Sequence, residues 1–140
     1  MRKILFLCHG NICRSPMAEF IMKDKVKKLN KSNEFEIVSK ALSYEEIGHD
    51  IYPYAKECLD NHNIPYSRRA ASIFSESDYA YFDEIYVMDD SNMRIISRKI
   101  DDKYNKIKLL NGYIEDPWYT GNFDKVFNEI SEGIDSLLNV

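Results

Sequence analysis

Short apolar runs recur along the chain and are separated by longer polar segments. The run at residues 3–8 is too short for a buried helix and fits a strand that is covered on both faces. Comparable runs predict further strands at residues 35–39, 85–88 and 106–110. These segments predict one sheet whose strands are largely buried.

Apolar residues at helical spacing predict helices between and after these strands. Pro16 suits the first turn of one helix, which ends in a lysine-rich turn that complements the helix dipole. A second helix is predicted at residues 53–62, and a third follows Asp89, which can act as its N-cap. The C-terminal segment places a set of apolar residues on one helical face: Phe123, Val126, Phe127, Ile130, Ile134, Leu137 and Leu138. Alternating strands and helices predict an α/β protein with a parallel sheet covered on both sides.

Length, charge and cysteine content narrow the class of protein. A chain of 140 residues can bury a core, and without repeats or linkers we expect a single domain over residues 1–140. A net charge of -4 argues against nucleic acid as a partner. Three cysteines do not suit a disulfide framework, and no apolar stretch is long enough for a secretory signal or a membrane span. We therefore expect a cytoplasmic location with free thiols.

Two polar segments follow predicted strands. Residues 8–15 come after the first strand, and residues 89–92 come after the strand at 85–88. In an open parallel sheet, ligands bind beyond the carboxyl ends of the strands. We expect both segments to lie at that edge.

Residues 8–15 have the composition of an oxyanion-binding loop. A turn between a strand and a helix N-terminus points backbone N–H groups inward, and Gly10 and Asn11 tolerate the unusual backbone angles of such a nest. Arg14 offers a planar fork of donors for two phosphate oxygens. The same donors would stabilise a Cys8 thiolate, and Ser15 could donate a hydrogen bond to it. Cys8 is therefore a candidate nucleophile.

A cysteine at a strand end is usually a core residue, and Cys-x5-Arg occurs by chance. The glycine, the asparagine, the Ser-Pro ending and the position between a strand and a helix favour a functional loop over that interpretation. The loop lacks the Gly-Lys-Ser/Thr ending that a nucleotide-binding P-loop requires. Zinc binding through Cys8, His9 and Cys13 lacks a fourth ligand with suitable spacing.

Three motifs in register resemble the low-molecular-weight protein tyrosine phosphatases along essentially the whole chain. They are Cys8-His9-Gly10-Asn11-Ile12-Cys13-Arg14-Ser15-Pro16 with Met17-Ala18-Glu19, Val87-Met88-Asp89-Asp90-Ser91-Asn92, and Asp116-Pro117-Trp118-Tyr119. The resemblance implies a flavodoxin-like, three-layer α/β/α fold. Its central sheet would have four parallel strands in the order 2-1-3-4.

The resemblance also implies a reaction. Cys8 would form a phosphocysteine while Arg14 and the loop residues His9, Gly10, Asn11, Ile12, Cys13 and Ser15 hold the phosphate. Asp116 would protonate the departing phenol, whose pKa of about 10 makes it a poor leaving group, and would then activate water. Trp118 and Tyr119 would wall the pocket. No metal or cofactor is expected; the expected partners are phosphotyrosine proteins, with free phosphate as a product inhibitor.

Further residues resemble the family's supporting positions. Asn11 and Ser39 would hydrogen-bond to each other and hold the loop in shape. Asp89 would either orient Arg14 or cap the next helix, and Asn92 belongs to the same motif. Cys13 resembles a second loop cysteine that can form a protective disulfide with Cys8.

The chain departs from the family pattern beside the pocket. Residues 39–43 read Ser-Lys-Ala-Leu-Ser where relatives usually have Ser-Ala-Gly/Ala-Thr. A pocket aromatic of many members aligns with Glu45, so either Tyr44 takes that place or the slot is more acidic and open. A histidine that some relatives place near the loop serine aligns with Arg68.

Alternative functions remain open on the sequence. An arsenate reductase would use Cys8 but needs relay cysteines, and only Cys58 remains outside the loop. A protein-arginine phosphatase tends to have Thr where Ile12 stands. A noncatalytic phosphate-binding module would not need Cys8, Arg14 and Asp116 together.

Overall fold

A computed structural model describes residues 1–140 and contains one parallel sheet. The strand order is β2-β1-β3-β4, which confirms the predicted order 2-1-3-4. The strands are β1 (Arg2–Cys8), β2 (Phe35–Ala41), β3 (Glu84–Val87) and β4 (Ile107–Leu109).

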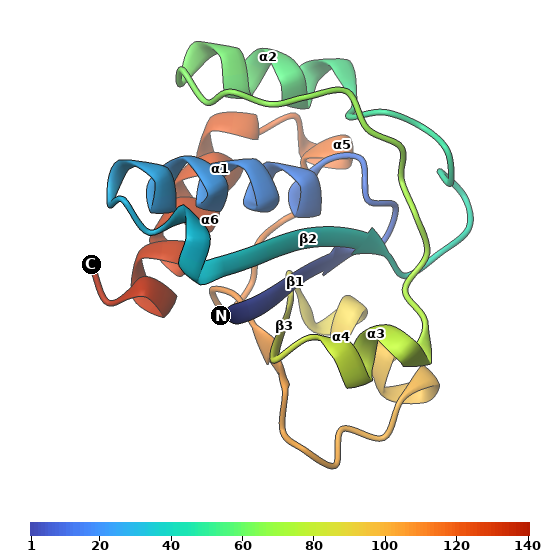
Figure 1. The fold of residues 1–140 in the computed structure, drawn as a ribbon. Coiled ribbons are helices and arrows are strands. Elements are labelled where there is room, and N and C mark those ends of the chain that lie inside the picture. Colours follow the sequence, from blue (N-terminus) through green and yellow to red (C-terminus); the bar gives the residue numbers. More distant parts are fainter.

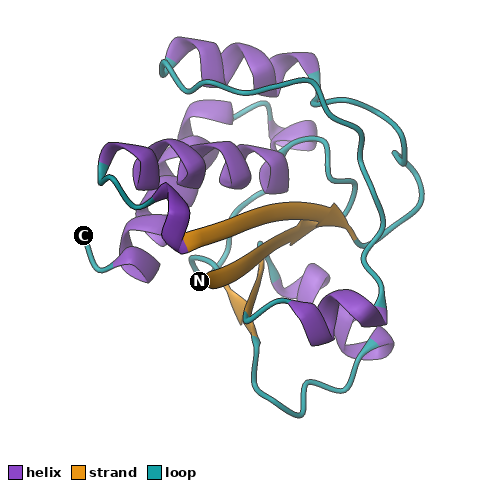
Figure 2. Cartoon of the chain, in the orientation of Figure 1, coloured by secondary structure: helices purple, strands orange, loops and turns teal.

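Helices cover both faces of this sheet and make a three-layer α/β/α fold (Figures 1 and 2). One face carries α1 (Arg14–Lys28), α2 (Pro53–Asn61), the short α5 (Pro117–Thr120) and α6 (Phe123–Leu138). The other face carries α3 (Glu76–Tyr81) and α4 (Asp90–Lys99). A 3-10 turn, η1 (Ser32–Glu34), leads into β2.

The central strand β1 joins the two halves of the core. Its residues 4–7 have no exposed surface. Ile4 and Phe6 belong to the apolar cluster under α1 and α6, whereas Leu5 and Leu7 belong to the cluster under α3 and α4. Successive side chains of a strand point to opposite faces, so an unbroken apolar run is what a strand covered on both sides requires.

The structure differs from the sequence prediction in the start of one helix and in two short helices. Helix α1 begins at Arg14, two residues before Pro16, so the end of the loop already belongs to the helix. Helix α3 was not predicted; it is short, and a capping box between Ser75 and Asp78 starts it. Helix α5 was not predicted either; Asp116 caps it and Pro117 is its first residue.

Three segments meet at the carboxyl edge of the sheet. Cys8 ends β1, Asp89 follows β3, and the segment leading to Asp116 follows β4. Parallel strands bring these positions together although they are far apart in the sequence. None of the helices has the length and apolar character needed to cross a membrane.

Candidate active site

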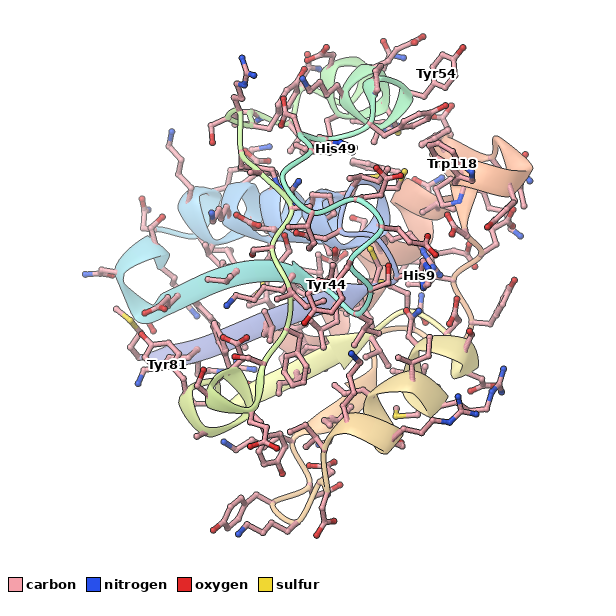
Figure 3. The ribbon with its side chains drawn as sticks, turned by 90° about the vertical axis from the view of Figure 1, so that its right-hand side faces the viewer. His9, Tyr44, His49, Tyr54, Tyr81 and Trp118 are labelled. Atoms are coloured by element: carbon pink, nitrogen blue, oxygen red, sulfur yellow. The ribbon has the colours of Figure 1, made fainter.

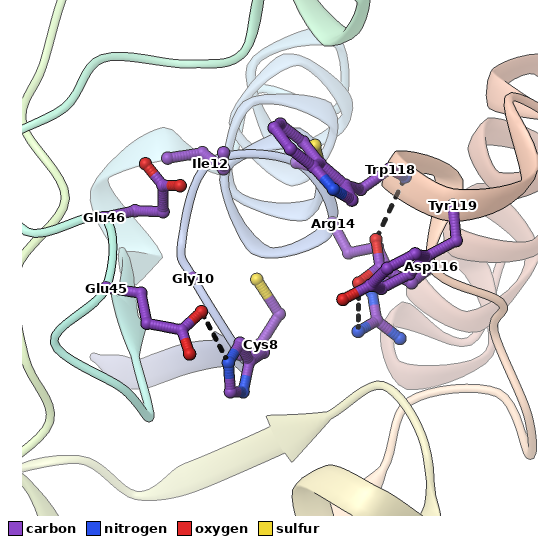
Figure 4. A pocket seen from close by; sticks show the side chains of 11 residues that line it. Cys8, Gly10, Ile12, Arg14, Glu45, Glu46, Asp116, Trp118 and Tyr119 are labelled. Atoms are coloured by element: carbon purple, nitrogen blue, oxygen red, sulfur yellow. Dashed lines mark hydrogen bonds and ion pairs between the residues drawn. The ribbon is translucent and has the colours of Figure 1, made fainter.

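A cavity opens at this edge (Figure 4). Its lining combines the loop after β1, the turn after β2 and the segment that leads into α5. The lining residues are Cys8, His9, Gly10, Ile12, Cys13, Arg14, Glu45, Glu46, Asp116, Trp118 and Tyr119.

The Cys8 sulfur is held by two donors. The backbone N–H of Asn11 donates to Sγ at 3.2 Å, and the Ser15 Oγ lies 3.0 Å from it. Asn11 has a φ of 60°, a left-handed conformation that asparagine tolerates better than most residues. This conformation turns the chain so that its amide faces back toward the sulfur.

The direction of the Ser15 hydrogen bond follows from its neighbours. The Asn11 side-chain amide Nδ2 donates to Ser15 Oγ at 2.8 Å and to Ser39 Oγ at 3.0 Å. Ser39 in turn donates to Glu19 at 2.6 Å. Because Ser15 Oγ already accepts from Asn11, its own hydrogen is free to donate to the Cys8 sulfur. A chain of polar groups thus delivers a donor to the candidate nucleophile.

Arg69 is a loop contact that the sequence analysis missed. Its Nη2 donates to the Asn11 carbonyl at 2.6 Å and its Nη1 donates to the His49 carbonyl at 3.2 Å. The family pattern pointed to Arg68, the preceding residue, which makes no such contact. An arginine in a segment without regular structure carried no sequence signal for this role, since the contact spans 58 residues.

The loop also presents free backbone donors. The N–H groups of Gly10, Ile12, Cys13, Arg14 and Ser15 make no hydrogen bond within the protein. The first turn of α1 contains no acidic side chain that would compete for them. Unpaired N–H groups at a helix N-terminus attract an anion with several oxygens.

Arg14 is buried at the base of the cavity, with 3% of its side chain exposed. Its Nη1 donates to Asp89 Oδ2 at 2.6 Å and to the Ile114 carbonyl at 2.8 Å. Burial lowers the pKa of Arg14, but the charges of Cys8, Asp89 and Asp116 outweigh this effect and raise it. Arg14 therefore stays a fixed cation.

Asp89 serves both roles that the sequence left open. Its Oδ2 accepts from Arg14, while its Oδ1 accepts from the backbone N–H of Asn92 at 2.8 Å and caps α4. Asn92 is 2% exposed, and its side-chain Oδ1 accepts from the Met88 backbone at 3.1 Å. Asn92 thus fixes the turn that carries Asp89 and does not line the cavity.

Asp116 reaches the cavity from the segment that leads into α5. Its Oδ1 accepts from the backbone N–H of Trp118 at 3.1 Å and so caps α5, and its Oδ2 lies 3.6 Å from Arg14 Nη2. The preceding Glu115 accepts hydrogen bonds from Lys125 and Asn122 at the start of α6. Hydrogen bonds from Lys125, Thr120 and Asn122 lower the pKa of Glu115 to about 2. This buried carboxylate ties the Asp116 segment to the body of the protein.

Aromatic side chains form one wall of the cavity. Trp118 packs on Tyr52 with ring centroids 4.6 Å apart, whereas Tyr119 is 83% exposed. Tyr44, which was expected in the pocket, is 74% exposed and is not among the lining residues (Figure 3). The geometry corresponds to the more acidic and open slot.

The turn after β2 explains this arrangement. The backbone N–H groups of Leu42 and Ser43 both donate to the His9 carbonyl, which fixes the start of the turn. Glu45 then pairs with His9 at 3.1 Å, and Glu46 packs against the loop where a Cβ on Gly10 would lie 3.3 Å from its side chain. A glycine at position 10 permits this close approach.

Cys13 lies beside Cys8 in the lining, and both thiols are free. Cys13 is only 4% exposed. Burial and the neighbouring Cys8 raise the pKa of the Cys13 thiol. A nucleophile is a thiolate, so the environment of Cys13 is unsuited to that role.

Comparison with known proteins places the chain in a family. The model of the family described as low molecular weight phosphotyrosine protein phosphatase matches residues 3–140. The Sus scrofa protein of that name is 40% identical over 133 residues, covering 88% of this chain and 84% of the relative. The low molecular weight protein-tyrosine-phosphatase PtpA of Staphylococcus saprophyticus is 32% identical, covering 99% of this chain and 93% of the relative. The crystal structure of YfkJ from Bacillus subtilis has a TM-score of 0.95 at 32% identity, covering 99% of this chain and 93% of that one. The chain therefore belongs to the low molecular weight phosphotyrosine protein phosphatase family and is a phosphatase enzyme.

Proposed function

We propose that this protein hydrolyses phosphotyrosine with Cys8 as nucleophile, Arg14 as phosphate clamp and Asp116 as general acid and base. The observation that carries the assignment is the convergence of the three side chains on one cavity. Beside them, the loop offers backbone N–H groups without acceptors. Arg14 and Asp116 lie beside each other, with 3.6 Å between Arg14 Nη2 and Asp116 Oδ2, and Cys8 lines the same cavity.

In the first step, the Cys8 thiolate attacks phosphorus and the bond to the phenolic oxygen breaks. Asp116 in its acid form gives its proton to that oxygen, so tyrosine leaves as a neutral phenol. The Ser15 hydroxyl stabilises the thiolate before attack. Arg14 and the free loop amides hold the remaining phosphate oxygens and stabilise their negative charge as the bonds change.

In the second step, water attacks the phosphocysteine and the phosphorus–sulfur bond breaks. Asp116, now a carboxylate, takes a proton from the water as it attacks. The products are inorganic phosphate and the Cys8 thiolate, which the same donors stabilise. Because these donors also fit free phosphate, we expect phosphate to act as a competitive product inhibitor.

The walls of the cavity support phosphotyrosine in proteins as the substrate. Trp118 and Tyr119 offer flat surfaces beside Asp116, which suits an aromatic leaving group. Ile12, where arginine phosphatases tend to have Thr, also lines this space. Cys58 does not line it, so the relay that an arsenate reductase requires has no second thiol there besides Cys13.

We also propose a cytoplasmic location and a single domain over residues 1–140. Three free cysteines suit a reducing cytoplasm. One sheet serves both apolar clusters, which supports a single domain over residues 1–140.

Trapping the intermediate tests the mechanism most directly. Purified enzyme is mixed with para-nitrophenyl phosphate, quenched in acid, and mapped by mass spectrometry for phosphate on cysteine. We expect phosphate on Cys8 in the wild-type enzyme and no turnover in Cys8→Ser. Binding of a phosphotyrosine peptide to Cys8→Ser serves as the control for folding. Normal turnover by Cys8→Ser, or phosphate on another residue, would contradict the assignment.

A further inference from the structure

A second group of chemically reactive side chains lies away from the cavity, between α2 and α6. Cys58 and His62 belong to α2 and its C-cap, and Asp124 lies in the first turn of α6. Their ligand atoms, the Cys58 Sγ, a ring nitrogen of His62 and a carboxylate oxygen of Asp124, all lie within 4.8 Å of one another. None of the three lines the active-site cavity.

The helices hold these groups in position before any ligand arrives. Cys58 and His62 are four residues apart, so they lie on the same face of α2. Cys58 is 4% exposed, and the His62 ring stacks on Phe127 at 3.7 Å with an interplanar angle of 10°. Stacking fixes the orientation of the imidazole, as supporting contacts do for metal-binding histidines.

The third side chain is aimed at the other two. Asp124 Oδ1 lies 3.1 Å from His62 Nε2 and 3.7 Å from Cys58 Sγ. A histidine–aspartate pair alone is common on protein surfaces. A buried thiol that converges on the same carboxylate oxygen is the feature that such a pair does not explain.

The donor set selects the kind of ion. Sulfur and imidazole ligands suit zinc, whereas magnesium and calcium prefer oxygen ligands. A surface hollow lined by Cys58 and Asp124 gives water access to a fourth position. We propose that Cys58, His62 and Asp124 bind a zinc ion that joins α2 to α6, with water as the fourth ligand.

Zinc binding has a defined proton balance. A cysteine thiol has an ordinary pKa of about 8.5, so Cys58 is a neutral thiol at pH 7 without metal. Coordination forms a zinc–sulfur bond and releases the thiol proton to solvent. No oxidant or reductant takes part.

The site lies behind the aromatic wall of the cavity. Tyr52, which precedes α2, packs on Trp118 at 4.6 Å and on Phe123, the first residue of α6, at 6.3 Å. A metal ion between α2 and α6 would therefore link the two helices that meet under Trp118. This inference is independent of the catalytic proposal and can fail without it.

Cobalt titration tests the site, because a thiolate bound to cobalt(II) gives a strong near-ultraviolet absorption band. Cys8 could bind cobalt as well, so the titration uses Cys8→Ser protein. We expect one band in Cys8→Ser and none in Cys8→Ser combined with Cys58→Ser. Zinc should displace cobalt and remove the band. Absence of the band in Cys8→Ser would overturn the proposal.

Replacement of His62 guards against a Cys58 variant that fails to fold. His62→Gln should weaken binding by more than the roughly 10- to 100-fold that loss of an outer-shell partner costs, since a direct ligand is removed. His49→Gln is the matched control, because His49 also pairs with a carboxylate, Glu46, at 2.6 Å but has no thiol beside it. A cobalt affinity unchanged in His62→Gln would refute the site.

Zinc-dependent stability gives a second readout on the same proteins. At free zinc about 100 times the dissociation constant, the unfolding equilibrium constant should fall about 100-fold. We expect this stabilisation in Cys8→Ser and in Cys8→Ser with His49→Gln, and its loss in Cys8→Ser with His62→Gln. Equal stabilisation of all three proteins would assign the zinc to another place.

Discussion

Asp89→Asn separates the ion pair with Arg14 from the cap of α4. Asparagine caps a helix about as well as aspartate, so the contact with the Asn92 backbone should survive. The replacement removes the negative charge that lies 2.6 Å from the Arg14 guanidinium. The change therefore tests one of the two functions of this side chain.

The expected cost follows from burial. Arg14 is 3% and Asp89 13% exposed, and removal of one partner of a buried pair costs about 3–5 kcal/mol. Arg14 retains the Ile114 carbonyl and Asp116, so we expect the lower end, about 3 kcal/mol of unfolding free energy. Asp89→Ala also loses the cap and should cost about 1 kcal/mol more.

Urea unfolding and hydrolysis of para-nitrophenyl phosphate measure the two consequences. A guanidinium displaced by about 1 Å should lower kcat/KM on the order of 100-fold. Asp90→Asn is the matched control, because it removes a charge from the exposed neighbouring position and should stay within about 0.5 kcal/mol of wild type. If Asp89→Asn behaved like Asp90→Asn in both assays, the pair would not hold Arg14 in place.

Three further variants test other parts of the site. Asp116→Ala should slow hydrolysis of phenyl phosphate by about 10²- to 10⁴-fold and hydrolysis of para-nitrophenyl phosphate much less, because only the poorer leaving group needs the proton. Equal slowing of both substrates would show that Asp116 is not the general acid. Ser15→Ala removes a hydrogen bond to the charged sulfur of Cys8, and such a bond is worth about 1.5–3 kcal/mol. We expect kcat to fall roughly 10- to 100-fold; an unchanged kcat would contradict this role of Ser15. The pKa of Glu115 is lower in the folded protein than its ordinary value of 4.5, so the ionised carboxylate stabilises the fold above pH 4.5. This stabilisation is lost as the pH falls toward about 2. Glu115→Gln should flatten the stability curve in that window, and parallel curves for the two proteins would show that its charge contributes nothing.

The sequence was sufficient for much of the fold and for the loop. The short apolar run within residues 3–8 predicted a strand covered on both faces, and residues 4–7 have no exposed surface. The spacing of apolar residues, the backbone preferences of glycine and asparagine, and the signals that start a helix each involve only a few neighbouring residues. They can therefore be recognised without tertiary structure. The order of strands came from the resemblance to a known family, because periodicity does not specify which strands are neighbours.

Contacts between distant segments were decided by the tertiary structure alone. Asp89 meets Arg14 across 75 residues, and Arg69 meets Asn11 across 58. The pairing of β1 with β3 brings the Asp89 segment to Arg14, and packing of the irregular segment that carries Arg69 brings this side chain to Asn11. No local rule distinguishes Arg69 from Arg68. Position 44 shows the same limit, since the turn after β2 carries Tyr44 outside the cavity lining and brings Glu45 and Glu46 into it.

The candidate zinc site combines both kinds of information. The four-residue spacing of Cys58 and His62 is visible in the sequence and places them on one helical face. Asp124 joins them only because α6 packs beside α2, 62 residues later in the chain. The sequence determined which groups each helix displays, and packing of the helices on the sheet determined which of these groups meet. The physical reason is that local spacing governs the direction of a side chain, whereas burial of apolar faces governs which elements become neighbours.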